Sequence, residues 1–275
     1  MGVSGRWASA ASLAVACGLI AACASDRASE VEKPSEVVPA RRAILIAVEP
    51  VPPPAADSIT FDLDLLGPGV EIEPAVEMPS ASADPNRSRT RFVFAAPGAE
   101  PRWFGELEVE TAYTWLARAR AAAAEDVDPT VGLVAAIDGV EPLALDALPD
   151  PAVDAGYATV LRARPLSLDF VDGSGVRYLA GLTDAYAPLT DRDLLYVFEG
   201  LTTDGRYHVA LRISVTAAVL MAGPELATLE DSLAFAEDTD AYVLELTDRL
   251  ARAEPGSFSP SLEQLDAFVR SLAIR

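Results

Sequence analysis

The chain has 275 residues, 51% of them hydrophobic, which is too apolar for an intrinsically disordered protein and enough to bury a sizeable core. Its net charge is −21, from 42 acidic and 21 basic residues, and Lys33 is the single lysine. Such a chain repels phosphate groups, which argues against nucleic acid as a partner and against electrostatic docking on anionic lipid.

Residues 1–22 have the features of an export signal. Arg6 supplies a positive charge near the start, and Ala8 to Ile20 forms an apolar stretch. This stretch is too short to span a bilayer, which takes roughly 20 apolar residues. It ends Leu19-Ile20-Ala21-Ala22-Cys23, which resembles the lipobox of bacterial lipoproteins. The resemblance implies cleavage before Cys23 and a diacylglycerol on the thiol of Cys23.

A soluble secreted protein, cut after the Ala-x-Ala site Ala14-Val15-Ala16, is the alternative. Two or more acyl chains, at ~0.8 kcal/mol per buried CH₂, would instead anchor the protein permanently. Ala24, not aspartate, follows the cysteine, which in a Gram-negative envelope would favour the outer membrane. We expect a protein anchored to the membrane by lipid and facing the periplasm or the exterior.

Cys17 and Cys23 are the only cysteines, and both lie within the first 23 residues. A disulfide framework, a cysteine nucleophile and a thiolate metal site are therefore excluded from the folded part.

Residues 23–56 are predicted to form a tether, with prolines at Pro34, Pro39, Pro50, Pro52, Pro53 and Pro54. At ~3.1 Å per residue, about 30 extended residues would reach on the order of 90 Å. Ala43 to Val48 interrupts the tether with a strand-like apolar run. Residues 57–275 are predicted to form a single α+β domain.

In the first half of this domain, Ser58 to Leu65 alternates apolar and polar residues, which predicts a strand. Short strands are predicted at Val70–Ile72, Arg91–Ala95 and Leu107–Val109. Thr111 to Ala124 is an alanine-rich helix, for which Tyr113 and Leu116 supply a buried face. Pro142 to Ala155 is rich in proline and aspartate and is predicted to be a connection.

Residues 166 to 215 are predicted to form about four consecutive antiparallel strands, a meander. Asp172-Gly173 and Asp204-Gly205 provide the turns between strands. From Tyr207 to Val215, apolar residues alternate with polar ones over ten residues that begin at Arg206. This period of two indicates a strand with one face in a core and the other in water.

Two helices are predicted near the C-terminus, after an acidic stretch from Glu225 to Asp240 that should be a loop with a turn or two of helix. Ala241 to Ala253 is amphipathic. The terminal helix is predicted to begin with Ser259 as N-cap and Pro260 at the first helical position. Its apolar face comprises Leu262, Leu265, Phe268, Val269 and Leu272. The fold class that follows is α+β, with helices packed on a mainly antiparallel sheet.

His208 is the only histidine, and it falls on the polar face of the meander strand, where we expect it to contact solvent. A Ser-His-Asp triad would need it, yet the sequence has no Gly-x-Ser-x-Gly elbow. It also lacks His-Glu-x-x-His, Walker A, Gly-x-Gly-x-x-Gly and EF-hand patterns. We therefore expect no catalytic residue, no metal and no cofactor.

Two acidic groups could offer oxygen ligands to Ca²⁺: Asp191 with Asp193, and Glu237, Asp238 with Asp240. With 42 acidic residues in the chain, a solvated surface is the expected role of both groups. A carboxylate pair for glycosidic cleavage also stays open, because its separation depends on the fold.

Aromatic and basic residues of the meander have two interpretations each. Core or cross-strand packing is expected for the aromatic set, and a ligand-binding shelf is the alternative; the set is Tyr178, Tyr196, Phe198 and Tyr207. For Arg177, Arg206 and Arg212 we expect pairing with nearby carboxylates, and an anion site is the alternative.

Three segments carry a resemblance to a known family: Asp172 to Leu179, Leu195 to Tyr207, and Phe258 to Asp266. They resemble a family of exported bacterial proteins without assigned function. In that family Gly-Val-Arg-Tyr-Leu precedes Tyr-x-Phe-Gln-Gly-Leu-Thr-x-Asp-Gly-x-Tyr-Tyr-Val, and a Phe-Thr-Pro-x-Leu-x-x-Leu-Asp helix ends the chain. The resemblance implies export and a shared fold, and it supplies no reaction.

This chain departs from the family pattern at two positions. It has Glu199 where glutamine is frequent and His208 where a second tyrosine is usual. The C-terminal half also resembles PsbP-like and Mog1-like domains, which are mostly binding or assembly modules.

These observations predict a lipid-anchored, non-enzymatic envelope protein that binds a protein partner or a small ligand. A secreted carboxylate-dependent hydrolase acting on carbohydrate and a Ca²⁺-dependent adhesion module are the alternatives.

Overall fold

The computed structural model describes residues 56, 58–73, 89–96, 103–122, 133–135, 137–138, 158–183, 188–220 and 229–275. Cys23, the tether with Ala43–Val48, and the connection Pro142–Ala155 lie outside these ranges. The predictions made for them are therefore untested by the fold.

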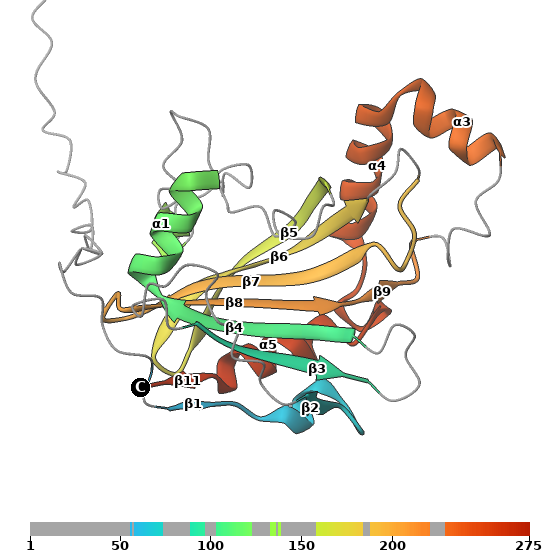
Figure 1. The fold of residues 1–275 in the computed structure, drawn as a ribbon. Coiled ribbons are helices and arrows are strands. Elements are labelled where there is room, and N and C mark those ends of the chain that lie inside the picture. The colour runs from blue at the N-terminus through green and yellow to red at the C-terminus, as the bar shows by residue number, and fades with distance from the viewer. Residues whose placement is uncertain are drawn as a thin grey trace, which may run out of the picture. The chain divides into compact units, whose positions relative to one another are not determined.

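One antiparallel sheet of seven strands organises the described residues, in the order β2-β3-β4-β8-β7-β6-β5 (Figure 1). Its strands are β2 (Glu71–Glu73), β3 (Arg89–Ala95), β4 (Trp103–Thr111), β5 (Ala158–Phe170), β6 (Gly173–Thr183), β7 (Leu194–Thr202) and β8 (Tyr207–Ser214). Consecutive strands β5 to β8 are neighbours, so the predicted meander is confirmed. Gly205 adopts φ 68° in the turn before β8, a conformation that glycine tolerates best.

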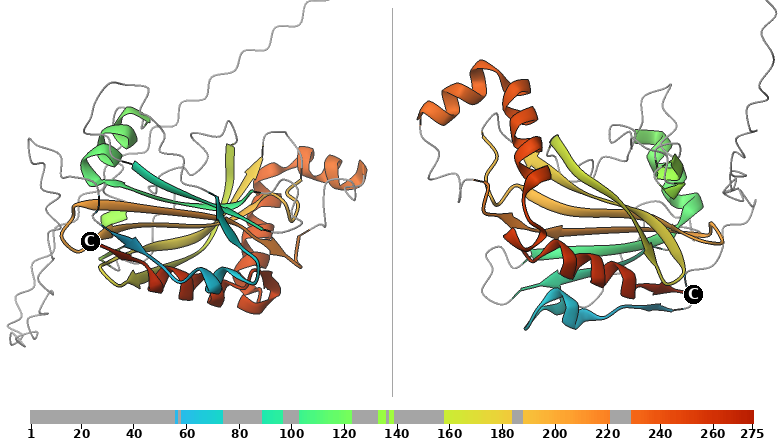
Figure 2. Two further views of the ribbon diagram at one scale, coloured as in Figure 1. Left: turned by 60° about the horizontal axis from the view of Figure 1, so that its bottom comes forward. Right: turned by 180° about the vertical axis from the view of Figure 1, so that it is seen from behind.

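Helices cover both faces of the sheet. The helices that contact its strands are α1 (Ala112–Ala122), α4 (Thr239–Arg252) and α5 (Leu262–Ser271), and α3 (Leu229–Glu237) packs on α4. The helix α5 lies along one face, while α1 stands on the opposite face (Figures 1 and 2). The prediction of an α+β fold with helices on a mainly antiparallel sheet is confirmed.

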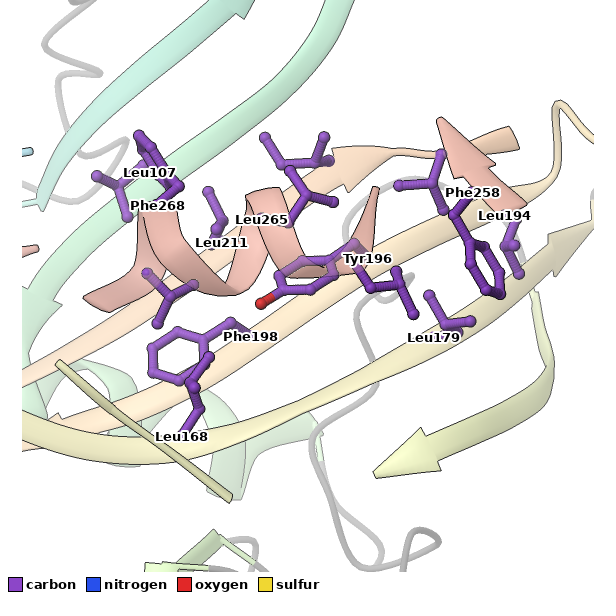
Figure 3. Packing of buried hydrophobic residues seen from close by; sticks show 14 of the residues in the cluster. Leu107, Leu168, Leu179, Leu194, Tyr196, Phe198, Leu211, Phe258, Leu265 and Phe268 are labelled. Atoms are coloured by element: carbon purple, nitrogen blue, oxygen red, sulfur yellow. The ribbon is translucent and has the colours of Figure 1, made fainter. Parts of the chain in front are cut away.

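The larger core lies between the sheet and α5, where leucines and aromatic rings interdigitate (Figure 3). Phe268 of α5 packs edge-on against Phe94 of β3, with ring centroids 5.8 Å apart. The four meander aromatics are all buried, as predicted. The predicted apolar face of the terminal helix is also buried throughout.

Two short strands, from near the beginning and the end of the described residues, pair beside α5. The strand β1 (Ile59–Thr60) pairs with β11 (Ala273–Ile274), and the backbone groups of Ser58 and Arg275 exchange two hydrogen bonds of 3.0 Å. Another small antiparallel pair joins β9 (Thr216–Ala217) to β10 (Phe258–Ser259).

Two predicted boundaries are wrong because local side-chain hydrogen bonds decide them. The strand predicted from Ser58 to Leu65 ends at Thr60, since the Asp62 carboxylate accepts from the Asp64 amide at 3.2 Å and starts a 3₁₀ turn. The terminal helix is capped by Ser261, whose hydroxyl accepts from the Gln264 amide at 3.2 Å. Ser259, the predicted cap, instead belongs to β10.

The acidic stretch before α4 contains more helix than predicted, because α3 runs for nine residues. None of the helices in the described part of the chain has both the length and the apolar character needed to cross a bilayer.

Candidate functional site

The face of the sheet opposite α5 carries a group of charged side chains. Side chains alternate along a strand, so Leu107 and Val109 of β4 enter the α5 core while the residues between and beside them face the other way. We call this group the sheet-face cluster. It comprises Glu106, Glu108 and Glu110 of β4, Arg89 and Arg91 of β3, Glu199 of β7, His208 and Arg212 of β8, and Arg118 of α1.

His208 lies at the centre of this cluster and is only 1% exposed. Its Nε2 atom lies 2.7 Å from Oε2 of Glu199, and its Nδ1 atom lies 3.8 Å from Oε1 of Glu110. The indole of Trp115 stacks on the imidazole, with ring centroids 4.5 Å apart and an interplanar angle of 13°. The prediction that His208 faces solvent is wrong, because α1 covers this end of the polar face.

The arginines join the carboxylates into a connected network. Arg212 lies between two of them, with Nη1 3.1 Å from Glu106 and Nη2 3.7 Å from Glu199. Arg91 donates from Nε to Glu106 at 2.8 Å. The cluster therefore sets four carboxylates against four guanidinium groups and one imidazole.

Arg118 is the member of the cluster that comes from a helix. It pairs with Glu110 and lies 3.4 Å from Glu108, which also pairs with Arg89. Two buried carboxylates of β4 thus share a guanidinium that comes from α1.

The pKa values of two glutamates move in opposite directions. Burial raises the pKa of Glu110 above its usual value, and His208 and Arg118 only partly oppose this effect. Burial also acts on Glu199, but His208 and then Arg212 outweigh it, so the pKa of Glu199 is lowered. The same pairing, with Glu199 first and Glu106 second, overcomes burial and raises the pKa of Arg212.

An apolar layer borders the cluster under α1. Trp115 and Leu116 are buried in a common cluster with Val176 and Val197 of the sheet. Tyr113, which the sequence analysis assigned to the buried face of this helix, is 45% exposed. That prediction is wrong, because the helix turns positions 112, 115 and 116 toward the sheet.

A separate buried ion pair lies on the α5 face. Asp266 accepts from the Tyr196 hydroxyl at 2.9 Å and from Nε of Arg177 at 3.2 Å. Burial and then the Asp266 carboxylate raise the pKa of Tyr196 well above 10.0. The predicted carboxylate pairing therefore holds for Arg177 and for Arg212, whereas the guanidinium of Arg206 lies 5.9 Å from the ring centroid of Tyr207.

One residue of each acidic group considered as a Ca²⁺ site has a local structural role. Asp193 accepts from the amide and the hydroxyl of Thr190, at 2.7 and 2.8 Å. Asp238 caps α4 by accepting from the Ala241 amide at 3.0 Å. Among the described residues, no three or more His, Cys, Asp or Glu side chains are grouped so that they could hold a metal ion.

Sequence reasoning missed most of the sheet-face cluster. The alternation of Glu106, Glu108 and Glu110 with apolar residues was the available signal, but it could not show that a helix would cover them. The two departures from the family pattern, Glu199 and His208, turn out to contact each other.

A comparison with protein families, with curated proteins and with solved structures finds no match to this chain. The resemblances to exported bacterial proteins and to PsbP-like and Mog1-like domains therefore stay predictions.

Chemically, the sheet-face cluster can hold and exchange protons inside the protein and can fix α1 on the sheet. The side chains of Glu108, Glu110, Glu199 and His208 are at most 2% exposed, so a substrate would have to displace α1 to reach them.

Proposed function

We propose that this protein is a lipid-anchored cell-envelope protein whose α+β head is a non-enzymatic binding or assembly module. The observation that carries the proposal is the run Leu19-Ile20-Ala21-Ala22-Cys23 at the end of a short apolar stretch. Small residues before the cysteine suit a peptidase that closes on extended backbone. The proline-rich tether that follows would hold the head away from the bilayer.

Lipidation is tested by growing a bacterial host that expresses the full chain with tritiated palmitate. We expect the protein to incorporate label and Cys23→Ala to lose it. Cys17→Ala is the matched control, because it removes the only other cysteine and should keep the label. Label that persists in Cys23→Ala, or a wild-type chain without label, would refute the anchor.

The ion pairs of the sheet-face cluster support the proposal that the α+β head is a binding module and not an enzyme. Each of its four carboxylates contacts an arginine or the histidine, which is typical of a structural ion-pair network. A head of this kind would contribute its outer surface to recognition, while the cluster positions α1. The partner would be an envelope protein or a small ligand.

A carboxylate-dependent hydrolase is the second candidate, and one observation favours it. Glu110 and Glu199 face the same histidine, yet their pKa values are shifted apart. Such a split is the arrangement by which carboxyl groups take separate acid and base roles.

Turnover of a panel of chromogenic glycosides by the wild-type chain tests this candidate. A hydrolase would lose activity by roughly 10²–10⁴-fold in both Glu110→Gln and Glu199→Gln, the usual contribution of a general acid or base. Wild-type protein that leaves the whole panel intact would favour the binding module.

A further inference from the structure

The helix α1 is joined to the sheet without a linker, because β4 ends at Thr111 and α1 begins at Ala112. The Thr111 hydroxyl accepts from the Thr114 amide at 3.2 Å and so caps the first turn. The rest of α1 is held on the sheet by side-chain contacts. A short helix attached in this way can leave the sheet as a unit, at less cost than global unfolding.

Apolar and charged contacts both hold α1 in place. Trp115 and Leu116 are buried with Val176 and Val197 in the cluster under the helix. Arg118 adds the charged contact, which reaches Glu110 and Glu108 from the helix side.

Among the described residues, Glu110 forms an ion pair with one arginine, whereas Glu108 forms ion pairs with two. Glu108 pairs with Arg89 and also lies near Arg118, whereas Glu110 shares Arg118 and otherwise faces His208 at 3.8 Å. Glu108 itself is a like charge beside Glu110 on the same strand face. One guanidinium from α1 therefore serves two carboxylates that cannot reach water.

The other charged groups that face this interface are occupied with each other. Glu199 of β7 contacts His208 and Arg212 of β8. Glu106 of β4 contacts Arg212 and Arg91. Arg89 of β3, which pairs with Glu108, also lowers the pKa of Glu110, but less than His208 and Arg118 do, and together they do not overcome burial. Tyr178 of β6 lies in the apolar cluster beneath the helix.

We propose that α1 is a pH-sensitive latch, whose docking on the sheet weakens as the buried Glu110 carboxyl loses its proton. Release would uncover the apolar residues under α1 together with the buried charges. In the exported protein proposed above, the latch would respond to pH outside the cell, although the latch itself does not require lipidation.

Proton linkage determines that docking of α1 weakens, and does not strengthen, as pH rises. The pKa of Glu110 is raised while α1 is docked, chiefly by burial, and returns toward 4.5 when α1 leaves and water reaches the carboxyl. The docked state therefore binds the proton more tightly. As pH rises from 4.5 through the docked pKa, this contribution to docking is lost, at about tenfold per pH unit for one proton.

Glu199 affects docking of α1 with the opposite dependence on pH, and it sets the lower limit of the pH range in which Glu110 alone controls docking. Its pKa is lowered in the docked state, so its contribution is present above 4.5 and is lost only as pH falls through its docked pKa. Between pH 4.5 and the docked pKa of Glu110, Glu199 stays ionised and the change in docking comes from Glu110.

Trp115 reports whether α1 is docked, because it belongs to α1 and stacks on His208 of the sheet. The full chain with Trp7→Phe and Trp103→Phe keeps Trp115 as its only tryptophan. Quenching by acrylamide is measured as pH is raised from about 4.5 to 8. We expect the quenching of Trp115 to rise with pH, and to stay low throughout in the same chain with Glu110→Gln. Glu263→Gln, an exposed position on α5, is the matched control and should keep the rise.

Hydrogen exchange at a fixed pH above the transition separates latch opening from unfolding. Amides of α1 should exchange faster in the wild-type chain than in Glu110→Gln, while amides of β7 exchange equally in both. Should Glu110→Gln fail to fold, Arg118→Gln is the second variant. It removes a positive charge that lowers the pKa of Glu110, so the rise in quenching of Trp115 should persist and begin at a lower pH than in the parent chain.

Three results would overturn the latch. One is quenching of Trp115 that does not change with pH, and another is the same rise in Glu110→Gln as in its parent. The third is exchange in β7 that accelerates together with exchange in α1.

Discussion

Replacing Glu199 by glutamine is expected to destabilise the head strongly. Glutamine keeps the volume of the side chain and removes its charge, which leaves His208 and Arg212 buried beside a neutral amide. Glu199 lies 2.7 Å from the imidazole and 3.7 Å from the guanidinium, and its side chain is 2% exposed. Removing one partner of a buried pair costs about 3–5 kcal/mol, so we expect a loss of about 3 kcal/mol or more in the free energy of unfolding.

The free energy of unfolding lost in Glu199→Gln should be larger at neutral pH than at acidic pH. Because the folded-state pKa of Glu199 is lowered, the stabilisation by its carboxylate is fully present above 4.5 and disappears as pH falls through the folded-state pKa. Urea unfolding of wild-type and Glu199→Gln chains, at about pH 7 and again at about pH 3.5, measures both effects. Glu263→Gln controls for the loss of a negative charge at an exposed site.

At neutral pH, a loss in the free energy of unfolding below about 1 kcal/mol, the size expected of an exposed pair, would refute a strong buried contact of Glu199. A difference that grew as the pH fell would refute the assigned sign. A double-mutant cycle with His208→Tyr tests the contact directly. Loss of both partners should cost less than the sum of the single losses, with a coupling of about 0.5–3 kcal/mol.

Two further predictions concern the α5 face and its helix start. Asp266→Asn should cost about 3–5 kcal/mol in urea unfolding, because it leaves Arg177 buried without its carboxylate, whereas Tyr196→Phe removes one hydrogen bond and should cost about 1–3 kcal/mol. Equal losses for the two variants would count against the ion pair as the dominant contact. Ser261→Ala should cost about 1 kcal/mol through loss of the α5 cap, and Ser259→Ala, at an exposed position, should stay within about 0.5 kcal/mol. The reverse order in thermal or urea unfolding would restore Ser259 as the cap.

The sequence by itself determined the elements whose patterns are local. The alternation from Tyr207 to Val215 fixes a strand because successive side chains must point to opposite faces. The turn at Asp204-Gly205 and the apolar stripes of α4 and α5 depend on neighbours within a few residues. For this reason the meander and both terminal helices were predictable, apart from ends that single hydrogen bonds shift by a few residues.

The candidate site was beyond such patterns. Alternation shows that His208 lies opposite the α5 core, but it cannot show whether water or another element covers that opposite face. The cover is α1, which is separated from His208 by about ninety residues of chain and meets it through the pairing of β4 with β8.

Tertiary structure alone therefore decided the chemistry of this protein's polar face. It paired Glu110 with His208 across two strands, brought Glu199 from a third, and covered all three with Trp115 and Arg118. Burial by an element remote in the chain determines whether a charged side chain is a solvated surface group or part of a proton-sensitive interior. That burial is a property of how the elements pack, and no local run of residues contains it.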